Sequence, residues 1–165
     1  MNLLATHLAA LVLPATLLLT VALAAIARID AATLRIPDAL SLPLIAAGLL
    51  WAALLPGQPL AGHLIGAAAG YVSLALIGEV YFRKTGTEGL GLGDAKLYAA
   101  AGAWLGWQAL PPVLLIAATA GLIAALTRSR HPDASRALAF GPWLALGFWL
   151  VWLWQILAPL AWDGF

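Results

Sequence analysis

Residues 88–106 read EGLGLGDAKLYAAAGAWLG and place an acid and a base at the head of a long uncharged segment. After Asp94 and Lys96, no charged residue occurs from Leu97 to Leu126. Ionisable groups at the edge of such an apolar run are costly to keep there and usually have a function. The glycines before Asp94 carry no side chain, so another backbone can approach its carboxylate closely. Asp94 is therefore the first candidate for a functional residue.

A phosphate-binding loop is the alternative interpretation of the glycine-rich part of this stretch. Its spacing is not G-x-G-x-x-G, no strand is predicted before it, and no charged partners for a nucleotide follow it. The formal net charge of +1 gives no sign of a nucleic-acid partner either. We therefore expect neither a nucleotide cofactor nor bound nucleic acid.

The composition indicates a membrane protein. Of the 165 residues, 64% are hydrophobic and 9% are charged, more apolar surface than one soluble domain of this size could bury. We expect one integral-membrane domain over residues 1–165. The absence of cysteine excludes disulfides, thiolate zinc sites and a cysteine nucleophile. The three histidines are far apart in sequence, so neither a metal site nor a cofactor is expected.

Apolar runs predict an all-α, polytopic fold, because roughly 20 apolar residues cross the hydrocarbon core as a helix. Two consecutive prolines, Pro111 and Pro112, cannot lie inside a helix without cost and divide the longest run. Glycines spaced four apart favour close helix packing in lipid, at Gly62, Gly66 and Gly70 and again at Gly102 and Gly106. The six predicted spans are 8–27, 39–55, 60–78, 92–110, 112–126 and 137–162.

Charge placement predicts the orientation. All the lysines and arginines fall in or beside the first, third and fifth loops: Arg28, Arg35, Arg83, Lys84, Lys96, Arg128, Arg130 and Arg136. The second and fourth loops and both termini contain none. By the positive-inside rule the charged side is cytoplasmic, and both termini lie outside.

Five carboxylic acids fall at that charged edge of the predicted spans: Asp30, Asp38, Glu79, Glu88 and Asp94. Without suitable cysteine or histidine partners, such a cluster favours acid–base chemistry by two carboxyl groups that share a proton. The charged group would activate a water while the protonated one polarises a carbonyl.

Each acid also has an ordinary structural explanation. Asp38 follows Ile36-Pro37 and precedes a predicted helix, so capping is the simpler role. Glu79 has the i+4 spacing for an ion pair with Arg83. Glu88 could be a solvated loop charge, and Asp30 is undecided on the sequence alone. Asp94 is the strongest candidate of the five.

Three ordered motifs resemble those of the type IV leader peptidases (prepilin peptidases), which are membrane aspartic proteases of the GxGD class. GLGD at residues 91–94 is similar to the family signature, within the similar stretch 88–107. Asp30 and the sequence RIPDALSLPL at residues 35–44 resemble the other catalytic segment, and FGPWLA at residues 140–145 resembles a motif of the last span.

The resemblance implies that Asp30 and Asp94 are the catalytic pair, with no metal or cofactor. At position 38 the family also uses asparagine, which argues against Asp38 as a catalytic acid. Lys96 is two residues from Asp94 and therefore points to another side of its helix. The other motif positions imply substrate-binding or supporting roles, for Gly91, Gly93, Lys96, Glu88 and Asp38.

The function implied is removal of the basic leader from a pilin-like (prepilin, Flp or pseudopilin) precursor at the cytoplasmic face of the bacterial inner membrane. We expect the precursor's hydrophobic helix to slide against the small-residue faces of the third and fourth spans. The chain resembles the short form without a Cys-x-x-Cys segment, so N-methylation is expected to be absent. The alternatives are a proton-coupled transporter and a non-catalytic secretion-system subunit.

Overall fold

The computed structural model describes residues 3–54, 59–87, 89–128 and 138–162, and within these ranges it contains α-helices and no strand. The predicted all-α fold is confirmed. Four helical segments are long and apolar enough to cross a membrane, and α2 is a shorter apolar helix. The helices are α1 (Leu3–Thr33), α2 (Asp38–Leu54), α3 (Leu60–Thr85), α4 (Leu92–Leu105), the 3₁₀ turn η1 (Trp107–Ala109), α5 (Leu110–Arg128) and α6 (Gly141–Trp162).

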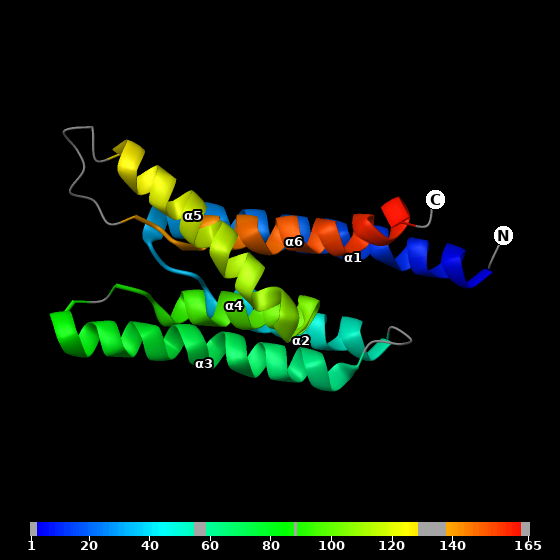
Figure 1. Cartoon of the computed structure of the whole chain (residues 1–165), viewed down its shortest axis with the longest axis horizontal. Helices are drawn as coiled ribbons and strands as arrows, with labels where there is room; N and C mark the ends of the chain where they lie inside the picture. Colours follow the sequence, from blue (N-terminus) through cyan, green and yellow to red (C-terminus); the bar gives the residue numbers. More distant parts are fainter. Residues whose placement is uncertain (1–2, 55–58, 88, 129–137, 163–165) are drawn as a thin grey trace.

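Successive helices run in opposite directions along the long axis of the molecule (Figure 1). The connection from α1 to α2, the connection from α3 to α4, the end of α5 and the start of α6 lie at one end. The start of α1 and the end of α6 lie at the other end. The described parts of the charged connections predicted from the sequence are thus gathered at one end, which we call the charged end.

The packing of α3 against α4 confirms the predicted close approach at Gly66 and Gly70, but not at Gly62, where an added Cβ would make only ordinary contacts. A Cβ atom at Gly66 would lie 2.5 Å from the carbonyl oxygen of Gly102, and one at Gly70 would lie 2.6 Å from the carbonyl oxygen of Tyr98. Side chains at these positions would therefore force the two backbones apart. In lipid, where apolar burial drives association only weakly, this close approach is a main source of helix–helix attraction.

The helix boundaries differ from the prediction in several places. The fourth span ends at Leu105, because Gly106 takes φ 81°, a left-handed conformation that ends the helix. Gly106 is thus not part of a packing face. The fifth helix was predicted to begin at Pro112 and begins at Leu110, so both prolines lie in its first turn, where a missing N–H costs little.

Two other boundaries move as well. The first helix continues through the predicted polar turn to Thr33, because the residues before Leu34 still support helical hydrogen bonds, including Leu34 N–H to the carbonyl of Asp30 at 2.8 Å. The last helix begins at Gly141, where the carbonyl of Phe140 accepts its first hydrogen bonds. Both shifts bear on the site, since they place Asp30 in a helix and Gly141 at a helix start.

Polar groups inside the bundle are paired across helices. The indole N–H of Trp149 donates to Thr20 Oγ1 at 2.9 Å and that of Trp152 donates to Thr16 Oγ1 at 3.1 Å, which ties α6 to α1. Trp104 of α4 donates to the Leu44 carbonyl of α2 at 2.8 Å and packs edge-on against Trp152. Such pairing is required where no water is present to satisfy a buried donor.

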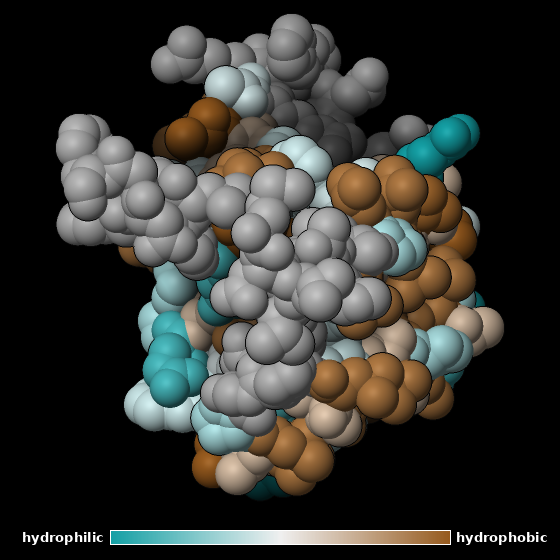
Figure 2. All heavy atoms as spheres, turned by 90° about the vertical axis from the view of Figure 1, so that its right-hand side faces the viewer, coloured by the Kyte–Doolittle hydropathy of each residue, from teal (hydrophilic) through white to brown (hydrophobic). Residues whose placement is uncertain are grey.

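The outer surface is apolar instead. Large hydrophobic side chains point away from the bundle on several helices, among them Leu17 (66% exposed), Leu115 (68%) and Trp154 (70%). Figure 2 shows hydrophobic residues over much of the surface around the end opposite the charged end. An exposed apolar surface of this extent is typical of helices that face lipid. The chain is a multi-pass membrane protein.

Candidate active site

Asp30 lies in the last turn of α1 and is 5% exposed, although it is an acid. Its Oδ2 accepts a hydrogen bond of 2.9 Å from the backbone N–H of Gly141, the first residue of α6. The first N–H groups of a helix have no partner within the helix, so this donor is available to an acceptor from elsewhere. The contact joins residues 111 positions apart in the chain.

Asp94 lies in the first turn of α4 and is half-buried. Its Oδ2 accepts a hydrogen bond of 3.2 Å from the N–H of Gly91, the residue that caps the same helix. This bond is one half of a capping box, so one oxygen of Asp94 has a structural role. The other oxygen, Oδ1, is buried and has no hydrogen-bond partner within the described part of the chain.

The two carboxyl groups are close enough for their charges to interact. Ile36, a buried residue of the α1–α2 connection, touches the backbone beside both of them. A Cβ atom at Gly93 would lie 2.9 Å from Ile36 Cβ, and one at Gly141 would lie 3.0 Å from Ile36 Cδ1. The fold therefore brings Asp30 and Asp94, 64 positions apart in the sequence numbering, to one place at the charged end.

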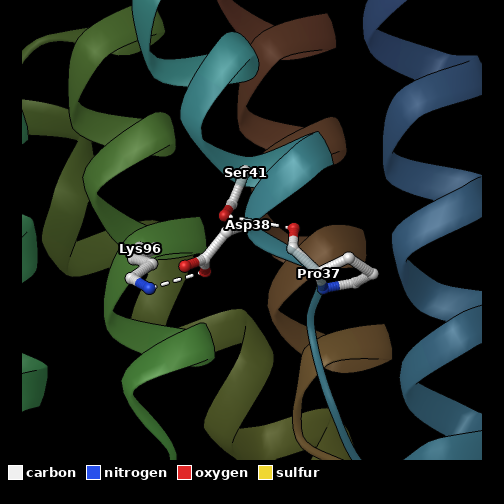
Figure 3. A network of polar contacts seen from close by, with 4 residues as sticks. All are labelled: Pro37, Asp38, Ser41 and Lys96. Carbon is white, nitrogen blue, oxygen red and sulfur yellow. Dashed lines mark hydrogen bonds and ion pairs between the residues drawn. The ribbon is translucent and has the colours of Figure 1, made fainter.

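Asp38 and Lys96 form an ion pair between the start of α2 and the first half of α4 (Figure 3). The Asp38 side chain is 58% exposed and that of Lys96 is 23% exposed. The sequence predicted capping as the simpler role of Asp38, and the contact that the structure shows is a bridge to another helix. Lys96 pairs with Asp38 and thereby links α2 to the helix that carries Asp94.

The remaining predicted acids are less informative. Glu79 pairs with Arg83 at 2.6 Å on the same face of α3, as its i+4 spacing predicted. Glu88, predicted as a supporting residue, lies outside the described residues. Within the described ranges, no three His, Asp or Glu side chains are grouped as a metal site would need.

A groove of about 440 Å³ opens beside the Asp94 loop. Ala75, Gly78, Glu79 and Phe82 of α3 form one wall, and residues 90–92 form the other. Because Gly91 both lines the groove and donates to Asp94, the groove reaches the immediate neighbourhood of that carboxylate. The small-residue faces predicted to receive a substrate helix are, in contrast, filled by each other: Gly66 lies against Gly102, and Gly70 against Tyr98. That prediction is wrong.

The sequence pattern of the type IV leader peptidase family matches residues 17–126, two-thirds of the chain and both aspartates with it. The chain belongs to this family. The resemblance predicted from the motifs is thereby confirmed.

Several proteins described as prepilin leader peptidase/N-methyltransferases are similar to this chain. The prepilin leader peptidase/N-methyltransferase of Aeromonas salmonicida is 46% identical over 142 residues, 85% of this chain and 49% of that protein. The protein of the same description from Dickeya chrysanthemi is 49% identical over 124 residues, 74% and 44% of the two chains. The protein of the same description from Neisseria gonorrhoeae is 42% identical over 135 residues, which are 82% of this chain and 46% of that protein. The chain spans about half the length of these relatives. No solved structure matches it.

Two residues of this candidate site were not predicted as site residues. Gly141 lies in the FGPWLA motif at residues 140–145, but the last helix was predicted to begin at residue 137. In such a helix the Gly141 N–H would be paired within the helix and could not bind Asp30. A glycine followed by proline ahead of an apolar run was the available signal for a helix start there. Ile36 gave no signal beyond its place before Pro37.

Proposed function

We propose that this protein is an aspartic endopeptidase that removes the basic leader from a pilin-like precursor, with Asp30 and Asp94 as the catalytic pair. The observation that carries the proposal is the meeting of these two buried or half-buried acids, from separate helices, at the charged end. Family membership supports the same reaction, since the similar relatives are described as prepilin leader peptidases.

The proposed chemistry needs only the two carboxyl groups and a water. One carboxylate takes a proton from the water as its oxygen attacks the peptide carbonyl, and the protonated partner donates to the carbonyl oxygen. Collapse of the tetrahedral intermediate breaks the C–N bond, and the amine leaves with a proton from the pair. Asp94 Oδ1, which is buried without a protein partner, is suitably free to bind the reacting groups.

The proposed setting is the bacterial inner membrane with the charged end in the cytoplasm. Lysine and arginine concentrate on the connections at that end, which favours a cytoplasmic location for it. The scissile bond would reach Asp94 along the groove beside Gly91, between α3 and residues 90–92. Residues 1–165 would act as one peptidase unit with no metal or cofactor.

A proton-coupled transporter fits the structure less well. A relay needs acids distributed through the depth of the membrane. In this chain the four acids within the described ranges, Asp30, Asp38, Glu79 and Asp94, lie toward the charged end. A non-catalytic secretion subunit would not need two interacting buried carboxyl groups.

The test is cleavage of a purified precursor by purified protein, with the mass of the new N-terminus as readout. Asp94→Asn and Asp30→Asn are expected to be folded and inserted but inactive. Asp38→Asn is the matched control, an acid at the same end that is expected to retain most activity. Leader release by Asp94→Asn at the wild-type rate would refute the assignment.

A further inference from the structure

We infer that Gly141 is a positioning residue for Asp30: its backbone N–H fixes the carboxylate, and its lack of a side chain leaves the carboxylate room. This inference rests on the proposed function in so far as it assigns Asp30 a place in catalysis. The anchor itself is a structural statement that can be tested without activity.

The first step is electrostatic. Asp30 lies in the last turn of α1, and the C-terminal end of a helix carries a partial negative charge that disfavours a carboxylate. The N-terminal end of α6 carries the opposite partial charge and presents the Gly141 N–H at 2.9 Å from Oδ2. The start of α6 therefore compensates for the unfavourable position of Asp30 at the end of α1.

The second step is the difference between the two acids. Asp94 receives its hydrogen bond from Gly91, three residues earlier in its own loop, so its orientation is set locally. The anchor of Asp30 comes from a helix that begins 111 residues later. The orientation of Asp30 relative to Asp94 thus depends on where α6 begins, and Asp30 is the acid that a change at Gly141 affects directly.

The third step is space. A Cβ atom at Gly141 would lie 2.6 Å from Asp30 Oδ2 and 2.9 Å from Asp30 Cγ. It would also lie 3.0 Å from Ile36 Cδ1, and Ile36 is buried. An alanine at 141 would have to displace the carboxylate, since the carboxylate is the nearest group and the buried Ile36 leaves little further room. The Gly141 N–H binds Asp30 Oδ2, and the absence of a side chain at residue 141 leaves room for this same oxygen.

The anchor is tested first, on ¹⁵N-glycine-labelled full-length protein in detergent micelles. In Asp30→Leu the Gly141 amide proton loses its acceptor, so it is expected to exchange faster and shift upfield. Asp30→Asn keeps an oxygen acceptor and is expected to retain most of the protection. The amide of Gly147, further along α6, serves as the internal reference for an intact helix. Unchanged Gly141 exchange in Asp30→Leu, with Gly147 still protected, would overturn the inference.

The positioning role is tested by comparing Gly141→Ala with Gly147→Ala. The control is at least as severe sterically, because a Cβ at Gly147 would lie 2.5 Å from the Val113 carbonyl oxygen of α5. It does not touch Asp30. We expect Gly141→Ala to lower kcat about 100-fold with KM nearly unchanged, since a displacement near 1 Å of a reacting group has an effect of that order. Gly147→Ala is expected to lower the unfolding temperature and to keep the kcat of the folded fraction.

The outcomes separate the two claims. A Gly141→Ala enzyme whose kcat per folded molecule equals that of the wild type would overturn the positioning role. A loss of kcat in both alanine variants, in proportion to unfolded protein, would overturn it too. If wild-type protein releases no leader while Asp30→Leu still frees the Gly141 amide, the proposed function fails and the anchor stands as a structural contact only.

Discussion

Gly102→Ala tests whether the small-residue face of α4 is closed by α3. The added Cβ would meet the carbonyl group of Gly66 and would lie 2.8 Å from Ala67 N. Both are backbone groups of α3 and cannot rotate away, so the helices must separate. Overpacking of this kind costs about 1–3 kcal/mol, and the rigid contact favours the upper value. Alanine is more favourable than glycine inside a helix by about 1 kcal/mol, which offsets part of this cost. The expected net loss is about 2 kcal/mol.

Gly62→Ala is the matched control on α3. A Cβ at Gly62 would lie 3.8 Å from Pro59 Cγ and 3.8 Å from Trp107 Cδ1, which is ordinary contact. Only the propensity gain remains, reduced because the site is close to the helix start, so we expect a stabilisation of about 0.5 kcal/mol. The two alanines should therefore differ by about 2.5 kcal/mol, nearly a hundredfold in the unfolding equilibrium constant.

The assay is unfolding in mixed micelles of a mild detergent and sodium dodecyl sulfate, followed by circular dichroism. Cleavage kinetics are measured on the same preparations. If Gly102→Ala were as stable as the wild type and raised only KM for the precursor, the α4 face would be open to substrate. That result would refute the packing argument and restore the substrate groove that the sequence predicted.

Three further changes test the packing and the polar contacts, each by the same unfolding measurement. Phe148→Ala should lower the free energy of unfolding by about 2 kcal/mol, because Phe148 is fully buried and its removal leaves a cavity. The loss from transferring apolar surface is small in lipid, so the cavity accounts for most of the cost. A negligible cost would contradict the buried position. Trp149→Phe should cost about 0.6 kcal/mol, because it removes one interhelical bond to Thr20; an equal loss in a Thr20→Val background would show that the bond is not its origin. Lys96→Met and Asp38→Asn should show a coupling of about 0.5 kcal/mol in a double-mutant cycle, the size of a partly exposed ion pair; strictly additive effects would mean that the pair contributes nothing.

Gly66 and Gly70 show how much of the helix packing could be predicted from the local sequence pattern. Their spacing predicted a close contact, and the contact exists, because one face of a helix recurs every three or four residues whatever its partner is. The identity of the partner was not predicted: the α3 face meets α4 instead of a substrate helix. A glycine repeat shows that one face of a helix has no bulky side chains, and only the fold shows which element packs against that face.

The sequence by itself determined the membrane class, the alternation of charged and uncharged connections, and Asp94 as the acid at the head of an apolar helix. These features depend on composition or on residues a few positions apart. The tertiary structure alone decided that α4 ends at Leu105, that Asp38 pairs with Lys96, and that α6 starts where its first N–H meets Asp30. The physical reason is the range of the interactions. A helix and its cap are short-range, whereas the second anchor of the proposed catalytic pair forms only when two segments more than a hundred residues apart are packed together.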